Sequence, residues 1–292
     1  MTRPLADRIA VVAGATRGAG RGIATMLGEA GATVYCTGRS VRGRSPSGRP
    51  ETIDETAELV AENGGIGIAV QVDRSDPEQV GALASRVEAE RGRVDVLVND
   101  IWGGEPLAEW GKPFWEHSLD KGLAMLRQAI DTHIITSHFF APMMVRRRRG
   151  LIVEITDGEN LDYRGSFFYD LVKVSVIRLA YSMAQELRPH GVTAVSLTPG
   201  FLRSEEMLDH FGVSAATWRE AIAQDPHFAA SETPAYIGRA VAALAADPRV
   251  FEKTGEALST WRLSEAYGFV DADSARPHWG RHFEEHVKVS SQ

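Results

Sequence analysis

Short apolar runs alternate with helical patterns along most of the chain. Residues 9–13 are apolar throughout, which is typical of a strand buried on both faces of a sheet, and residues 21–30 predict a helix that ends at Gly31. The same alternation recurs as far as residue 260. Continuous apolar strands separated by helices predict a parallel sheet with helices on both faces, which is a doubly wound α/β architecture.

The predicted elements cover one domain. Strands are expected at residues 9–13, 33–37, 66–72, 94–98, 151–156, 192–198 and 256–260, and helices at 21–30, 51–63, 77–91, 119–148, 168–187 and 234–246. Asp76 is expected to cap the helix that begins at Pro77, because proline suits the first helical position. Residues 39–50, rich in Arg, Ser, Gly and Pro, are expected to form an exposed loop. We predict a single domain over residues 1–262, with 263–292 as a C-terminal extension packed on it.

Composition narrows the class of protein. The 292 residues are 43% hydrophobic and 24% charged, as in an ordinary globular protein. A net charge of -7 argues against nucleic acid or an anionic membrane as a partner. The single cysteine, Cys36, excludes an internal disulfide and fits a reducing compartment. With no signal peptide, no apolar segment of membrane-spanning length and no metal-ligand spacing among the histidines, we expect a soluble cytoplasmic protein without a metal.

A glycine-rich turn separates the first strand from the first helix. Gly14, Gly18 and Gly20 let the backbone turn tightly and approach a pyrophosphate, and the following helix offers its free N–H groups to the phosphates. An ordinary glycine-rich turn is the alternative. Because the motif lies directly between a strand and a helix, we favour binding of a dinucleotide by a Rossmann-type domain.

The end of the second strand indicates which dinucleotide. An acidic residue there would accept a hydrogen bond from the ribose 2′-hydroxyl of NAD, but this chain has Thr37, Gly38 and Arg39. Arg17 lies within the glycine turn, so two guanidinium groups are expected near the ribose, where they suit a 2′-phosphate. NADPH is therefore favoured over NADH. The alternative is that both arginines are solvated surface residues.

Tyr169 and Lys173 form the candidate catalytic pair. Four residues apart on a predicted helix, they project from the same face. An ammonium close to a phenol favours the phenolate and lowers the pKa of the phenol toward neutrality. Such a tyrosine can give a proton to a carbonyl oxygen or take one from an alcohol.

The glycine turn and the Tyr169–Lys173 pair together resemble the short-chain dehydrogenase/reductase family, and the resemblance extends over essentially the whole chain. It implies that Tyr169 is the acid/base and that Lys173 tunes it and binds the nicotinamide ribose. It also implies an adenine contact at Asp73 and a nicotinamide-side contact at Ser204. The cofactor contacts implied as a set are Gly14, Thr16, Arg17, Gly18, Ala19, Gly20, Thr37, Arg39, Asp73, Asn99, Tyr169, Lys173, Pro199, Gly200 and Ser204. The segments 34–39, 150–153, 187–192 and 263–269 are similar to one branch of the family. Members act on small molecules and are usually homodimers or homotetramers.

The chain departs from the family pattern at two positions. Asp157 stands where the family has a catalytic serine, and the neighbouring Thr156 should point to the opposite face of its strand. A protonated Asp157 could donate to a carbonyl oxygen, and an ionised one could hold a cationic iminium substrate. A site that has lost turnover is the third alternative. The family's active-site asparagine is expected near Ala129, but no asparagine is present there; His133 lies nearby.

From these residues we predict an NADPH-dependent carbonyl reductase, or the reverse alcohol dehydrogenase, with Tyr169, Lys173 and Asp157 as catalytic residues. An imine or iminium reductase that uses Asp157 as counter-charge is the enzymatic alternative. An NADP(H)-binding protein without turnover is the non-enzymatic one.

Overall fold

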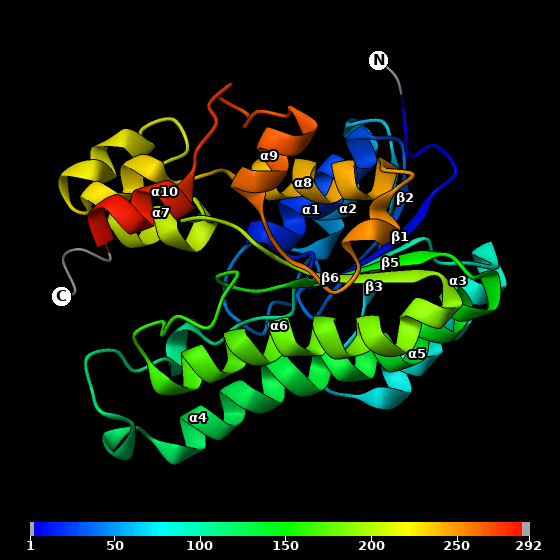
Figure 1. Cartoon of the computed structure of the whole chain (residues 1–292), viewed down its shortest axis with the longest axis horizontal. Helices are drawn as coiled ribbons and strands as arrows, with labels where there is room; N and C mark the ends of the chain where they lie inside the picture. The colour runs from blue at the N-terminus through cyan, green and yellow to red at the C-terminus, as the bar shows by residue number, and fades with distance from the viewer. Residues whose placement is uncertain (1–2, 288–292) are drawn as a thin grey trace.

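A computed structural model describes residues 3–287. Within this range the chain folds around a seven-stranded, entirely parallel sheet with the order β3-β2-β1-β4-β5-β6-β7 (Figure 1). The strands are β1 (Ile9–Ala13), β2 (Thr33–Gly38), β3 (Ile66–Gln71), β4 (Val96–Asn99), β5 (Gly150–Ile155), β6 (Val192–Thr198) and β7 (Ala257–Ser259). The predicted doubly wound parallel sheet is confirmed, because each predicted strand is present to within two residues at either end.

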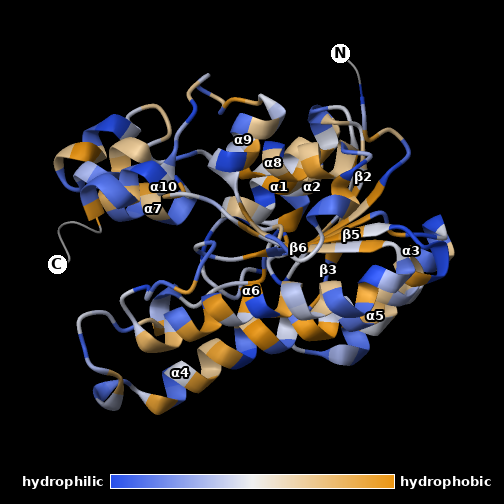
Figure 2. Cartoon of the chain, viewed as in Figure 1, coloured by the Kyte–Doolittle hydropathy of each residue, from blue (hydrophilic) through white to orange (hydrophobic). Residues whose placement is uncertain are grey.

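Helices cover both faces of the sheet and divide the core in two (Figure 1). On one face lie α1 (Gly18–Glu29), α2 (Ile53–Glu62) and α8 (Pro234–Ala246). On the other lie α3 (Pro77–Arg91), α5 (Thr132–Arg147) and α6 (Phe167–Leu187). In Figure 2 orange residues gather where these helices meet the strands, which is the burial that the continuous apolar runs predicted.

Helix ends follow their local chemistry. Asp76 caps α3 as predicted, since its carboxylate accepts from the backbone N–H groups of Glu78 and Gln79. The long predicted helix at 119–148 is interrupted. It consists of α4 (Leu119–Leu126), a π-helical turn η3 (Arg127–Asp131) and α5. Such turns inside helices are rare and often lie at functional sites.

A helical cap beside the carboxyl ends of the strands was not predicted. It contains α7 (Glu205–Phe211), η5 (Trp218–Ala223), η6 (Pro226–Ala230), α10 (Trp279–His282) and η8 (Phe283–Val287), and it lies at the left of Figure 1. Trp218 and Phe228 are buried at its centre, and the ring of Phe201 packs on that of Trp279 with centroids 5.7 Å apart. The cap therefore joins segments far apart in the sequence.

The segment after residue 262 packs on the rest of the chain where it is described. Helix α9 (Thr260–Tyr267) follows β7 directly, so Thr260 begins a helix rather than ending a strand. Further on, the carboxylate of the buried Asp271 accepts from Arg203 and from the backbone N–H of Thr233. Short turns complete the chain at η1 (Glu105–Leu107), η2 (Phe114–Glu116), η4 (Arg188–His190) and η7 (Val250–Lys253). Among the helices of residues 3–287, none combines the length and the apolar character needed to cross a bilayer.

Candidate active site

A cavity of about 1350 Å³ opens at the carboxyl ends of the strands, between the glycine turn, the start of α6 and the helical cap. This is the edge where open parallel sheets bind ligands. Most of the predicted site residues line it: Gly14, Thr16, Arg17, Gly18, Ala19, Arg39, Asp73, Asp157, Tyr169, Lys173, Pro199, Gly200 and Ser204. The structure thus brings the predicted cofactor and catalytic residues into one cavity.

The glycine turn is shaped for close backbone approach. Gly14 has a φ of +92°, and a Cβ there would lie 2.1 Å from the carbonyl oxygen of Asp100. A Cβ on Gly20 would lie 2.2 Å from the carbonyl oxygen of Gly14. Both positions therefore require glycine. Gly18 and Ala19, in the first turn of α1, line the cavity, so the start of this helix lies where a phosphate group could be bound.

Besides Arg49, three arginines line the cavity near the glycine turn and β2. Arg39 is exposed, and Arg17 donates to the hydroxyl of Ser47 and lies 3.5 Å from the carboxylate of Glu51. Sequence reasoning missed the third, Arg74, which is 3% exposed. Its Nη2 donates to the hydroxyl of Thr37, but within the described part of the chain Nε and Nη1 have no hydrogen-bond partner. Burial lowers the pKa of Arg74 to about 9. A buried guanidinium with unpaired N–H groups would be stabilised by a ligand that is anionic or accepts hydrogen bonds at this end of the cavity.

Three residues of the predicted cofactor set are not among the residues that line the cavity: Gly20, Thr37 and Asn99. The Thr37 hydroxyl donates to the carbonyl of Val12, on the neighbouring strand. The amide of Asn99 donates to Ser137 and Glu154 inside the core. The Thr37 and Asn99 side chains are thus hydrogen-bonded within the fold, and their contacts with the cofactor stay predictions.

Tyr169 and Asp157 form a direct pair. The phenol hydroxyl lies 2.9 Å from Oδ2 of Asp157, to which it donates. Burial and the neighbouring Asp157 carboxylate raise the pKa of Tyr169 well above its usual range. This corrects the expectation that Lys173 lowers that pKa toward neutrality. Burial and the nearby carboxylate therefore oppose ionisation of the phenol.

Lys173 lies among aromatic rings and acidic groups. Its Nζ is 3.9 Å from the centroid of the Trp102 ring, a cation–π contact, and 5.3 Å from that of Tyr169. Burial lowers the pKa of Lys173, while the carboxylates of Asp157, Glu105 and Asp100 oppose that shift. Burial also raises the pKa of Asp100 to about 7. One lysine therefore faces several carboxylates, which makes this part of the cavity acidic.

The loop between β5 and α6 positions Asp157. The Thr156 hydroxyl donates to the carbonyl of Lys173, away from Asp157, as the alternation of strand residues predicted. Arg164, which the sequence analysis did not single out, donates from Nε to the carbonyl of Asp157 at 2.5 Å and from Nη2 to that of Asn160 at 2.7 Å. Its ion pair with Asp170 attaches the loop to the first turn of α6. A guanidinium group that donates to several backbone carbonyls holds an irregular loop in one conformation, and we call this contact the Arg164 clamp.

The π-helical turn carries an amide group near the position expected for the family asparagine. Gln128 lines the cavity and donates from Nε2 to the carbonyl of Trp102 at 2.9 Å. Ala129 itself is buried. His133 is also buried, with Nδ1 2.6 Å from Glu154 and Nε2 3.2 Å from the carbonyl of Ile101. The amide nearest the expected asparagine position is therefore that of Gln128, one residue before Ala129, whereas the side chain of His133 is buried in the core.

Two tryptophans enclose the tyrosine. The ring of Trp102 lies edge-on to Tyr169 with centroids 5.6 Å apart, and that of Trp110 is tilted at 5.1 Å. Trp102 also lines the cavity, as does Phe201. Trp110, Trp115 and Tyr163 are each more than half exposed. No group of three or more potential metal ligands occurs among the residues that the structure describes.

Comparisons with known proteins agree with this geometry. The family model for short-chain dehydrogenases matches residues 8–211. The human protein called dehydrogenase/reductase SDR family member 1 is 34% identical over an alignment that covers all of this chain and 90% of the relative. It represents the branch to which the four similar segments pointed. A 3-oxoacyl-(acyl-carrier-protein) reductase FabG of Staphylococcus aureus is 28% identical, over 78% of this chain and 92% of that protein.

Solved structures show the same fold. A structure from Beutenbergia cavernae, described as a candidate NAD(P)-dependent gluconate 5-dehydrogenase with bound NADP at low occupancy, has a TM-score of 0.69 and 29% identity. The match covers 88% of this chain and 96% of that one. A metagenomic short-chain oxidoreductase in complex with NADP has a TM-score of 0.66 and 25% identity, over 88% of this chain and 98% of that one. This chain is an oxidoreductase that belongs to the short-chain dehydrogenase/reductase family, whose members use NAD(P).

Proposed function

We propose that the protein is an NADPH-dependent reductase of a small carbonyl compound, working in reverse as an alcohol dehydrogenase. The observation that carries the proposal is the placement of the Tyr169 hydroxyl and the Lys173 ammonium in the cavity that the glycine turn also lines. When bound, NADPH supplies the hydride that a carbonyl carbon accepts. The rest of the chemistry belongs to side chains of the chain.

Tyr169 holds the proton that the reaction needs. Its raised pKa keeps the phenol protonated, which suits an acid that gives its proton to a carbonyl oxygen as that oxygen gains charge. Lys173 keeps positive charge beside the phenol and Trp102, so it offsets the tyrosinate that forms. The rings of Trp102 and Trp110 pack on that of Tyr169 and cover part of it.

Asp157 is proposed as the orienting group in place of the family serine. In its present geometry it accepts a hydrogen bond from the phenol and holds the hydroxyl in one direction. A protonated Asp157 would act as the serine does and donate to the substrate oxygen. In both cases the carboxyl group defines where the reacting oxygen lies relative to Tyr169.

The acidic surroundings of Lys173 favour a second candidate, reduction of an imine or iminium. Asp157, Asp100 and Glu105 lie close enough to Lys173 to influence its pKa. A cationic substrate would be attracted to these carboxylates, and the extra charge of an ionised Asp157 would then stabilise the substrate itself. A chain that binds NADP(H) without turnover remains the third proposal.

The choice of NADPH over NADH is supported by Arg17, Arg39 and Arg74 at one end of the cavity. Guanidinium groups pair well with phosphate oxygens, and Arg74 has two nitrogens without a partner among residues 3–287. Comparing the affinities for NADPH and NADH by fluorescence titration tests this choice. Equal affinities would contradict it.

Assembly into a homodimer or homotetramer is proposed on the apolar surface of two helices. Leu119 is 64% exposed on α4, and Leu171 and Tyr181 are 41% and 43% exposed on α6. Orange residues are visible along both helices at the lower edge of Figure 2. A surface of this kind often marks an interface. Light scattering coupled to gel filtration measures the mass, and a monomer would contradict the proposal.

The experiment that tests the function is NADPH consumption by the purified protein with a panel of ketones, aldehydes and cyclic imines, beside the variant Tyr169→Phe. Turnover that the variant abolishes while still binding NADPH supports a reductase. The substrate class that responds decides between the carbonyl and the imine. Binding without turnover across the panel favours the third proposal.

A further inference from the structure

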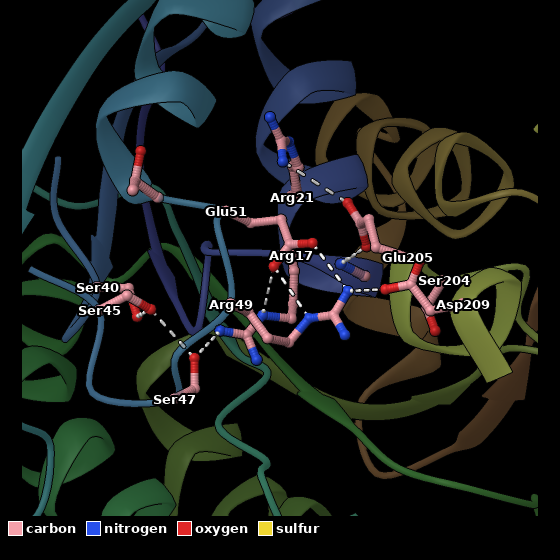
Figure 3. A network of polar contacts seen from close by, with 12 residues as sticks. Arg17, Arg21, Ser40, Ser45, Ser47, Arg49, Glu51, Ser204, Glu205 and Asp209 are labelled. Atoms are coloured by element: carbon pink, nitrogen blue, oxygen red, sulfur yellow. Dashed lines mark hydrogen bonds and ion pairs between the residues drawn. The ribbon is translucent and has the colours of Figure 1, made fainter. Parts of the chain in front are cut away.

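A carboxylate of the helical cap is hydrogen-bonded to the N-terminus of α1, the helix that follows the first strand. Oε2 of Glu205 accepts a hydrogen bond of 2.7 Å from the backbone N–H of Gly18, the first residue of α1. Glu205 is the first residue of α7, which Ser204 caps. The two partners are 187 residues apart in the sequence, so the contact exists only in the folded chain (Figure 3).

This contact uses the chemistry that a phosphate group would use. The free N–H groups at a helix N-terminus attract anions, and a carboxylate and a phosphate accept from them in the same way. A Cβ on Gly18 would lie 3.7 Å from Cβ of Ser204, an ordinary van der Waals distance, so the residue that caps α7 lies against the start of α1, and a single N–H group can serve only one acceptor at a time. A phosphate oxygen can therefore hydrogen-bond to the Gly18 N–H only after the Glu205 carboxylate has left it.

The Glu205 carboxylate also has a second partner within reach, the guanidinium of Arg21. Its Oε1 lies 3.7 Å from Nη1 of Arg21, which projects from the next turn of α1, and both side chains are partly exposed. Swinging fully to Arg21 would keep the carboxylate in an ion pair and free the Gly18 N–H. Two arrangements of one side chain are thus available over a short distance.

A second ion pair ties the same helix to the loop before α2, beside the glycine turn. Arg49, in the loop before α2, lies 2.7 Å from Asp209 of α7 and 2.9 Å from Glu51 (Figure 3). Arg49 and Ser204 both line the cavity. Helix α7 is therefore attached to the cavity at both ends, through Glu205 and through Asp209.

We propose that Glu205 is a built-in competitor of the cofactor phosphates and that it sets the affinity for NADP(H). Binding exchanges the Glu205 carboxylate for a phosphate oxygen at the Gly18 N–H and moves Glu205 to Arg21. The inference rests on the proposed binding of NADP(H). It concerns how tightly the cofactor binds and leaves the catalytic residues unchanged.

The test compares the dissociation constant of NADPH, measured by fluorescence titration, for the wild-type protein, Glu205→Gln and Glu205→Asp. Glu206→Gln is the matched control, because it removes the same charge one residue away without breaking the bond to Gly18. A partly exposed charge-assisted bond corresponds to roughly a fivefold to tenfold change in affinity. We expect Glu205→Gln to bind NADPH about tenfold more tightly than Glu206→Gln does. Glu205→Asp, whose shorter side chain retains the charge, should also bind more tightly than wild type.

The outcomes separate this inference from the proposed function. Equal dissociation constants for wild type and both Glu205 variants would overturn the inference and leave the function standing. The same gain in Glu206→Gln as in Glu205→Gln, with none in Glu205→Asp, would show a general charge effect and also overturn it. Failure of all four proteins to bind NADPH would overturn the proposed function, and the inference with it.

Discussion

Replacing Asp157 by asparagine should shift the alkaline limb of the pH–rate profile for reduction to lower pH. The variant retains the shape and an oxygen that can accept from Tyr169, but it removes the charge that contributes to the raised pKa of the phenol. A hydrogen bond to a charged group contributes about 1.5–3 kcal/mol and one between neutral groups about 0.5–1.5 kcal/mol. The midpoints of these ranges differ by about 1.25 kcal/mol, which corresponds to about one pKa unit.

The direction of the shift in the pH–rate profile depends on which protonation state of Tyr169 acts as the acid. The protonated phenol is the acid in reduction, so kcat/KM falls as the pH rises through the pKa of Tyr169. In Asp157→Asn that pKa is lower, because the carboxylate no longer opposes the tyrosinate. The fall in rate should therefore begin about one pH unit lower than in the wild type.

The assay is the pH dependence of kcat/KM for reduction of the responding carbonyl substrate, from neutral to alkaline pH. Glu159→Gln is the control, because it removes a carboxylate from the same loop that pairs with Arg262 rather than with Tyr169. An alkaline limb that stays in place or moves upward in Asp157→Asn would refute the reasoning. Complete loss of activity with NADPH binding intact would favour the imine reductase, in which the substrate itself needs the carboxylate.

Three further predictions concern residues around the site. Arg74→Met removes the buried guanidinium and should weaken NADPH binding by about tenfold or more, as a fluorescence titration would show; unchanged affinity would mean that Arg74 serves the fold alone. Arg164→Met frees the loop that carries Asp157, so it should lower kcat by about tenfold to a hundredfold with little change in the dissociation constant of NADPH. An unchanged kcat would contradict the role of Arg164 in positioning this loop. Burial raises the pKa of Glu232 to about 8 from its usual 4.5. The folded protein therefore keeps this proton over a pH range in which the unfolded chain loses it, so stability should fall as the pH rises from about 4.5 to 8. Glu232→Gln should flatten that fall in thermal unfolding, and identical pH profiles of Tm would disprove it.

Local sequence was enough to predict the sheet and the cofactor end of the site. Strands buried on both faces must be apolar throughout, so β1 at Ile9–Ala13 and β6 at Val192–Thr198 are visible without any knowledge of their partners. The glycine turn is equally local, because the close approach of Gly14 and Gly20 is a property of one bend in the backbone. The helical cap was missed, since turns as short as η5 and η6 carry no long periodic pattern.

Only the tertiary structure decided the electrostatics of the site. The sequence places Lys173 four residues from Tyr169 and shows that Asp157 is near, but it does not show which charge prevails. That depends on a 2.9 Å hydrogen bond and on burial, which together raise the pKa of the phenol. The contact between Glu205 and Gly18 joins residues that follow β6 and β1 and are 187 residues apart in the sequence. The sequence alone determines the residue types and the local backbone, whereas pKa shifts and competition for the Gly18 N–H arise from distances that exist only after folding.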